Sequence, residues 1–143
     1  MVETLADVID WHQRELIPDS AVLTSDRRTR LVNGDFFAMA EDAAGFDPET
    51  PGRRFHAVLV DIDHTPRHVL SSQHAAFYTP AGLTRLARHL HPDGVFALWS
   101  DDPPDPDFEA AMAQVFATST AQVVTFANHH TGGESSNTVY LGR

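Results

Sequence analysis

Two aspartates that follow a strongly apolar segment are the residues of this sequence best placed for chemistry. Residues 55–60 are almost entirely apolar, and the sequence D-I-D-H-T-P at 61–66 comes directly after them. A carboxylate at the end of a buried strand is partly removed from water, so it can be held as a general base or as a ligand. We therefore expect a functional role for Asp61, although the same residue could simply cap the next turn.

Phosphoryl transfer is one chemistry that fits this segment. A strand followed by Asp-x-Asp-x-Thr resembles the opening motif of haloacid-dehalogenase-type phosphatases. In that family the first aspartate is the nucleophile and the second the acid/base, with magnesium on carboxylates. The family also uses a lysine to hold the phosphoryl group, and this chain contains no lysine. We therefore keep this reaction only as a less favoured alternative.

Metal binding is a second alternative, because the chain contains nine histidines. Asp61, Asp63, His64 and His68 could offer carboxylate and imidazole ligands to zinc, nickel or iron. The sequence has no His-Glu-x-x-His motif or comparable ligand spacing. We predict no metal site.

Strand and helix signals alternate along the chain and would position these residues. Expected helices cover about 5–16, a short stretch after 35, 79–90 and a segment from 105, and expected strands cover 29–33, 55–60, 95–99, 122–127 and 138–141. The unbroken apolarity of 55–60 is typical of a strand buried on both faces. We predict one α/β domain over residues 1–143, with a Rossmann-like sheet and flanking helices. In such sheets ligands bind beyond the carboxyl ends of the strands.

Several short stretches occur in the order found in one enzyme family. They are V-E-x-x-x-x-V-I-D at 2–10, G-D at 34–35, V-L-V-D-I-D-H-T-P at 58–66, L-S at 70–71, F-Y at 77–78 and H-P-D-G-V-F at 91–96. In this order the chain resembles the spermidine synthase (aminopropyltransferase) family and the wider class I methyltransferase-type fold. The resemblance implies transfer of an aminopropyl or methyl group from decarboxylated S-adenosylmethionine, or from S-adenosylmethionine itself, to an amine.

The resemblance also implies roles for individual residues. Glu3 would bind the ribose of the nucleoside and Asp35 its adenine, with Asn33 and Gly34 in the same cofactor-binding turn. Asp61 would take a proton from the attacking amine, which must be neutral to attack a carbon beside a sulfonium. The rest of catalysis would be alignment of the amine with the leaving sulfur.

The acceptor side of the resemblance contains Asp63, His64, Tyr78 and Trp99. His64 stands where the family has a second aspartate, and Trp99 stands where it has a glutamine. Asp63 could supply the missing carboxylate from one position earlier. These differences predict an amine-like acceptor that is bound differently from the usual polyamine.

No Gly-rich turn and no first strand precede Val2 and Glu3, so we expect a sheet that is incomplete at the N-terminus. Backbone groups next to the absent strand would be unpaired. The alternative function is therefore a non-catalytic relative that acts as a binding or oligomerisation domain. A homodimer through an exposed sheet edge is the partner that we expect for either function.

Charge and composition exclude other classes of partner. The formal net charge of −10 repels phosphate backbones, so we expect no nucleic acid, and a small amine suits the sign. No apolar run approaches the roughly 20 residues of a membrane-spanning helix. With no cysteine and no secretory signal, we expect a cytoplasmic location.

Overall fold

The computed structural model of the chain describes residues 1–130 and 132–143 and contains two compact units. Unit 1 comprises Met1–Arg53 and unit 2 comprises Arg54–Arg143. Each unit has its own sheet, and each is described by itself. That residues 1–143 form one domain stays a prediction.

Unit 1 is a small α/β unit around a two-stranded parallel sheet. Strand β1 (Val2–Glu3) leads into helices α1 (Ala6–Gln13) and α2 (Ser20–Ser25), and β2 (Val32–Asn33) leads into α3 (Phe36–Glu41). The two strands pair with Glu3 opposite Asn33. Helix α3 begins where expected, directly after Asp35, whose carboxylate caps it.

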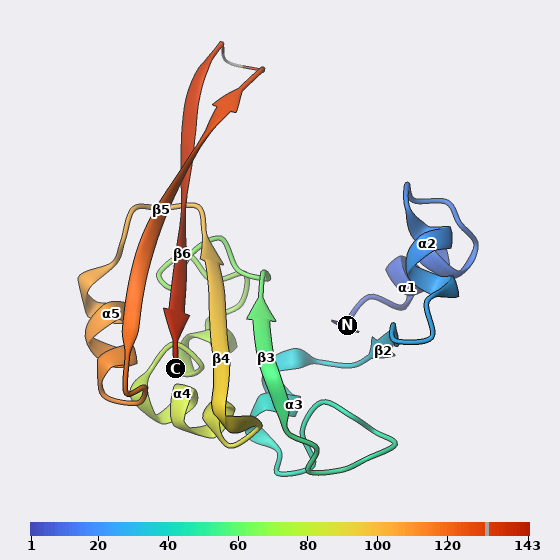
Figure 1. Ribbon diagram of the computed structural model, residues 1–143, viewed down its shortest axis with the longest axis horizontal. Coiled ribbons are helices and arrows are strands. Elements are labelled where there is room, and N and C mark those ends of the chain that lie inside the picture. Colours follow the sequence, from blue (N-terminus) through green and yellow to red (C-terminus); the bar gives the residue numbers. More distant parts are fainter. Residues whose placement is uncertain (131) are drawn as a thin grey trace. The chain divides into compact units, whose positions relative to one another are not determined.

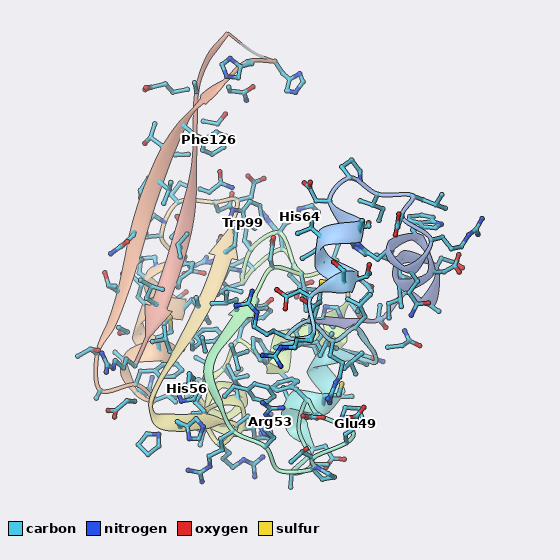
Figure 2. The ribbon with its side chains drawn as sticks, turned by 45° about the vertical axis from the view of Figure 1, so that its right-hand side comes forward. Glu49, Arg53, His56, His64, Trp99 and Phe126 are labelled. Atoms are coloured by element: carbon cyan, nitrogen blue, oxygen red, sulfur yellow. The ribbon has the colours of Figure 1, made fainter. Side chains whose placement is uncertain are left out.

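An ion-pair cluster stabilises the loop that follows α3. Asp47 is buried, and its two carboxylate oxygens accept hydrogen bonds from Arg30 Nη1 at 2.7 Å and Arg53 Nη1 at 2.9 Å. Arg30 also contacts Glu49; Glu49 and Arg53 are labelled in Figure 2. Hydrogen bonding to Arg53 lowers the pKa of Asp47, so the carboxylate stays ionised.

Unit 2 contains a four-stranded mixed sheet with strand order β3-β4-β6-β5 (Figure 1). Its strands are β3 (Phe55–Val60), β4 (Leu90–Ser100), β5 (Ser119–Asn128) and β6 (Gly133–Gly142). β3 and β4 run parallel, whereas β6 runs antiparallel to both β4 and β5. The predicted α/β, Rossmann-like class is therefore confirmed, although the strands divide into two separate sheets.

One face of this sheet is covered by helices α4 (Pro80–Ala87) and α5 (Pro106–Ala113). Phe96, Leu98 and Tyr140 point toward this side and are almost completely buried. The Phe96 and Phe116 rings stack at 5.6 Å, and the Phe108 ring meets Tyr140 edge-on at 4.9 Å. Aromatic packing of this kind fixes the spacing between the helices and the sheet.

Both covering helices begin where the sequence predicts. Thr79 caps α4 by accepting a hydrogen bond from Gly82 N, and Pro80 occupies the first helical position. Asp105 caps α5 by accepting from Asp107 N. Helix α2 and the 3₁₀ helix η1 (Ser72–Ala76) were not predicted.

The prediction that residues 55–60 are buried on both faces is wrong. Val58 and Val60 are buried, but Ala57 is exposed and Leu59 is 75% exposed. The reason is that α4 and α5 cover only one face of the unit 2 sheet, so alternate residues of β3 are exposed. Among the described residues, no helix combines the length and apolar character needed to cross a membrane.

Replacing Gly82 with alanine tests the contact that holds α4 against η1. A Cβ at position 82 would collide with the carbonyl oxygens of Ala76 and Phe77. We expect Gly82→Ala to lower the free energy of unfolding by about 3 kcal/mol, although alanine favours a helix by about 1 kcal/mol. Urea denaturation measures this loss. Gly133→Ala is the control, because nothing lies within 4 Å of its added Cβ; equal losses in both variants would contradict the prediction.

Candidate functional site

In unit 1 the structure brings together the four residues expected to bind a nucleoside. Glu3 and Asn33 are the last residues of β1 and β2, Gly34 and Asp35 follow β2, and Gly34 N donates to Glu3 O at 3.0 Å. Asn33 Nδ2 donates to the backbone oxygens of Glu3 and Thr4, both at 3.0 Å. The short parallel sheet therefore places two carboxylates at the carboxyl ends of neighbouring strands, Glu3 as the last residue of β1 and Asp35 two residues after β2.

One oxygen of each carboxylate accepts hydrogen bonds from backbone N–H groups two or three residues further along the chain. Glu3 Oε1 accepts from Leu5 N at 2.8 Å, and Asp35 Oδ1 accepts from Phe37 N and Ala38 N at 2.9 and 3.2 Å. Within the described residues, Glu3 Oε2 and Asp35 Oδ2 have no hydrogen-bond partner. One acceptor oxygen on each side chain is thus available to hydroxyl or amino donors of a ligand.

In unit 2 the two aspartates of the loop after β3 differ in burial and in contacts. Asp61 is exposed and has no hydrogen bond or ion pair with any described residue. Asp63 is buried, with only 2% of its surface exposed. The Asp61 carboxylate is therefore exposed to solvent without a partner among the described residues, whereas the buried Asp63 carboxylate holds the loop in place.

Asp63 is held by three groups that lie further along the chain. Leu70 N donates to Oδ1 at 2.6 Å, Tyr78 OH donates to Oδ2 at 2.8 Å, and His74 Nδ1 lies 2.9 Å from Oδ1. Burial, together with this hydrogen bond, raises the pKa of Tyr78 far above its usual range, so the phenol stays protonated. The expected roles of Asp63 and Tyr78 on the acceptor side stay predictions, since each is engaged with the other in this structure.

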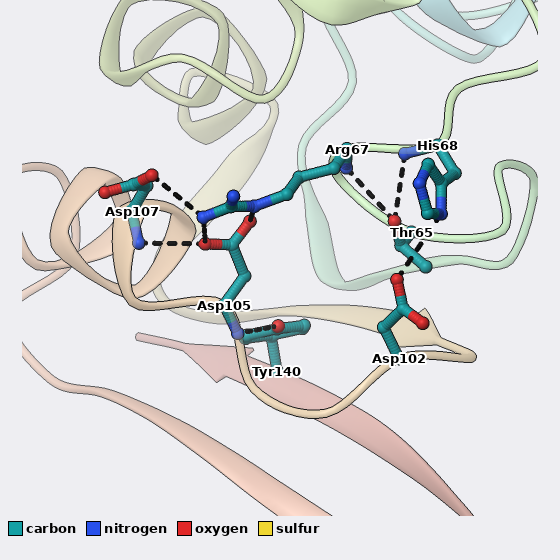
Figure 3. Close-up of polar contacts among 7 residues, drawn as sticks. All are labelled: Thr65, Arg67, His68, Asp102, Asp105, Asp107 and Tyr140. Atoms are coloured by element: carbon teal, nitrogen blue, oxygen red, sulfur yellow. Dashed lines mark hydrogen bonds and ion pairs between the residues drawn. The ribbon is translucent and has the colours of Figure 1, made fainter.

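A second set of contacts joins this loop to the loop after β4 (Figure 3). Arg67 Nε and Nη2 donate to the two oxygens of Asp105 at 2.6 and 2.7 Å, and Nη2 also reaches Asp107 at 2.9 Å. This guanidinium lowers the pKa of Asp105. Asp105 N donates to Tyr140 OH at 2.7 Å. Such bidentate pairing fixes the relative position of both loops.

Two further contacts join these loops, and two more lie within the loop after β3. Thr65 Oγ1 accepts from Arg67 N and His68 N, and Asp101 N donates to His64 O at 2.8 Å. His68 Nδ1 lies 3.4 Å from Asp102. The backbone on both sides of His64 is therefore constrained, while the His64 side chain is exposed.

A small cavity of about 230 Å³ lies between the two loops. Its lining residues are Thr65, Pro66, Arg67, Ser100, Asp102, Pro103, Pro104, Asp105, Pro106 and Tyr140. Ser100 Oγ is buried and, within the described residues, has no hydrogen-bond partner. A cavity of this size with a few polar groups in its wall can hold ordered water or a group of a few atoms.

The remaining acceptor-side residues, His64 and Trp99, lie at the carboxyl end of the unit 2 sheet (Figure 2). Trp99 alternates with the buried Leu98 and Ser100, so it lies on the sheet face that α4 and α5 leave uncovered. The four expected acceptor residues therefore differ in how far they are exposed to solvent. His64 is exposed and Trp99 is half-buried, whereas Asp63 and Tyr78 are buried.

The positions of these side chains also bear on the phosphatase and metal-binding alternatives. Asp63 would be the acid/base of a phosphatase, but its oxygens accept hydrogen bonds from inside the protein rather than facing a substrate. No group of three or more histidine, aspartate or glutamate side chains among residues 1–130 and 132–143 has the geometry of a metal site.

Tyr78→Phe tests how strongly the buried carboxylate depends on its phenol donor. Removing the hydroxyl leaves Asp63 Oδ2 without this donor, so we expect the free energy of unfolding to fall by about 1–3 kcal/mol. Urea denaturation of Tyr78→Phe, Asp63→Asn and the double variant completes a double-mutant cycle. Additive losses would show that the two side chains are not coupled and would contradict the role given to Asp63.

Comparison with solved structures places this arrangement in a known fold. Spermidine synthase from Thermotoga maritima matches with a TM-score of 0.61 and 16% identity over 99% of this chain. A spermidine synthase in complex with the transition-state analogue AdoDATO matches with a TM-score of 0.63 and 17% identity, also over 99% of this chain. Human methyltransferase-like protein 13 in complex with SAH matches with a TM-score of 0.60 and 16% identity, again over 99%.

This chain spans less than half of the two spermidine synthases, 42% and 44% of their lengths, and 59% of the methyltransferase-like protein. No model of a protein family and no curated protein matches it. At these identities the likeness concerns the fold. The chain thus has the α/β, Rossmann-like fold found in S-adenosylmethionine-dependent methyltransferases and spermidine synthases.

Proposed function

We propose that this chain is part of a transferase that moves an aminopropyl or methyl group to an amine-like acceptor. The donor is decarboxylated S-adenosylmethionine or S-adenosylmethionine itself. The amine nitrogen forms a bond to the carbon beside the sulfonium, the carbon–sulfur bond breaks, and the nitrogen loses a proton. The neutral thioether is the leaving product.

The state of Asp61 is the observation that carries this proposal. It is an exposed carboxylate with no partner among the described residues, on a loop that buried Asp63 and the Arg67–Asp105 pair hold in place. A general base must be free to accept a proton and must be held in a fixed position. We assign to Asp61 the removal of the proton from the acceptor amine.

The nucleoside of the donor is assigned to unit 1. Glu3 and Asp35 each keep one free oxygen, for ribose hydroxyls and for the adenine amino group respectively, and Asn33 and Gly34 fix the turn between them. The fold is shared with solved proteins in complex with AdoDATO and SAH, which supports a nucleoside ligand of this kind.

The acceptor is assigned to two residues of unit 2, the exposed His64 and the half-buried Trp99. His64 and Trp99 would contact a small amine, while Asp63 and Tyr78 keep the Asp61 loop in position. The net charge of −10 favours a cationic small molecule over nucleic acid. We propose a cytoplasmic location, where nucleoside donors of this class are available.

A non-catalytic binding or oligomerisation domain is the second candidate. The division of the strands into two sheets favours it, because β1 and β3 each leave one edge unpaired among the described residues. Donor binding and turnover by this chain distinguish the two candidates.

Asp61→Asn tests the assignment of the base. With either donor and putrescine or spermidine as acceptor, we expect the variant to transfer at least 100-fold more slowly, because asparagine cannot take the proton. Chromatography separates methylthioadenosine, the product of aminopropyl transfer, from S-adenosylhomocysteine, the product of methyl transfer. Asp93→Asn is the control, since Asp93 lies near the opposite end of β4. Turnover by Asp61→Asn at the unmodified rate would contradict the assignment.

Glu3→Gln and Asp35→Asn test the nucleoside site separately from chemistry. We expect each to weaken binding of methylthioadenosine about tenfold, because a charged acceptor is replaced by a neutral amide. Asparagine caps a helix as well as aspartate does, so α3 should stay intact. Calorimetry measures the affinity, with Asp10→Asn on α1 as the control. If the unmodified chain neither binds methylthioadenosine nor transfers from either donor, the second candidate function is favoured.

A further inference from the structure

The hairpin formed by β5 and β6 extends beyond the rest of the unit 2 sheet (Figure 1). The two strands pair from Ser119 opposite Gly142 to Asn128 opposite Gly133, without a register shift. Only residues 138–142 of β6 also pair with β4. The outer half of the hairpin, 124–128 with 133–137, is therefore a two-stranded ribbon, and such a ribbon is marginally stable alone in water.

The outer edge of β5 has no strand paired with it among the described residues. Every second residue of an edge strand directs its N–H and C=O groups away from its partner. Natural edge strands are protected against further pairing by charges, prolines, bulges or short length. β5 has none of these protections: its sequence, S-T-A-Q-V-V-T-F-A-N, is ten residues long and contains no charged residue, proline or glycine.

Apolar side chains are exposed on both faces of this strand. Val123 is 55% exposed, and Val124 and Phe126, which share the opposite face, are 46% and 47% exposed. Phe126 is labelled on the hairpin in Figure 2. A strand pairing along this edge would place its own side chains beside these three residues on both faces. The edge thus offers a hydrogen-bond ladder together with apolar contacts.

Charge favours a second copy of the chain as the occupant of this edge. Two molecules that each carry a net charge of −10 repel one another, so self-contact is tolerated best where charge is absent. None of the chain's 30 charged residues lies in β5. A two-fold axis pairs an edge strand with itself in the antiparallel direction, which is the direction in which β5 already pairs with β6.

The other free edge of the unit 2 sheet suits self-pairing less well. β3 has six residues, and its register with β4 shifts between Phe55 and Ala57. Charged residues adjoin both of its ends, Arg54 before it and Asp61 after it.

We propose that β5 of this chain pairs antiparallel with β5 of a second copy to form a homodimer. The two hairpins then form one four-stranded ribbon, and the two unit 2 sheets join into a continuous sheet. Ten residues from each copy can make about ten hydrogen bonds, the number typical of a specific protein interface. The dimer does not depend on the proposed transferase activity, because catalysis is assigned to other residues, and it gives the second candidate function a specific interface.

The mass of the full chain in solution tests this proposal. Sedimentation equilibrium or light scattering should give twice the 15.8 kDa of one chain. Val123→Lys/Val124→Lys places a charge on each face of β5, and we expect this variant to be monomeric and to keep the unmodified circular dichroism spectrum. Leu59→Lys, on the β3 edge, is the matched control and should stay dimeric. A monomeric unmodified chain, or a dimer lost only in Leu59→Lys, would overturn the proposal.

Single cysteines along β5 give a second test that does not depend on a charged variant folding. Because the sequence contains no cysteine, a variant with one introduced cysteine can form a disulfide only between two copies of the chain. Antiparallel pairing about a two-fold axis predicts strong oxidative cross-linking near one position of β5 and progressively less on either side. Leu59→Cys should not cross-link. Equal cross-linking at all positions, or none, would contradict self-pairing of β5.

Discussion

The buried carboxylate of Asp63 is the interaction on which the loop after β3 depends. A charge removed from water is costly unless hydrogen bonds replace its hydration. Leu70 N, His74 and Tyr78 OH provide that replacement from the segment that leads into α4. Because these groups follow Asp63 by 7 to 15 residues, the carboxylate closes the loop onto itself. Its fixed backbone is what leaves Asp61 exposed and free at the end of the strand.

The parts of this site that were predictable from the sequence are those with local signals. The apolar run at 55–60 identified β3, and Thr79-Pro80 and Asp105-Pro106 identified the starts of α4 and α5. The exposure of Asp61 and the burial of Asp63 were not predictable, because strand alternation ends where the loop begins. The partners of Asp63 could be recognised only once the chain had folded back.

Contacts between residues far apart along the chain were also not predictable from the sequence. Arg67 and Asp105 are 38 residues apart, and nothing in the spacing of ten arginines singles out Arg67. The apolarity of β3 was misleading for a related reason. Continuous apolar residues indicate that both faces suit burial, but burial also requires something that covers them. In unit 2 the helices cover one face only, so Leu59 is exposed despite its composition.

Strand β6 connects the candidate site to the hairpin, because it lies between β4 and β5. Its residue Tyr140 accepts a hydrogen bond from Asp105 N, and Thr138 Oγ1 donates to Asp102 O at 2.7 Å. The strand that supports the loop after β4 therefore continues directly into the unsupported ribbon. Since β5 pairs with β6 over its whole length, any partner that orders β5 also orders β6. Strand β6 is therefore shared by the two features: its residues 138–142 contact β4 and the loop after it, and its residues 133–137 belong to the two-stranded ribbon.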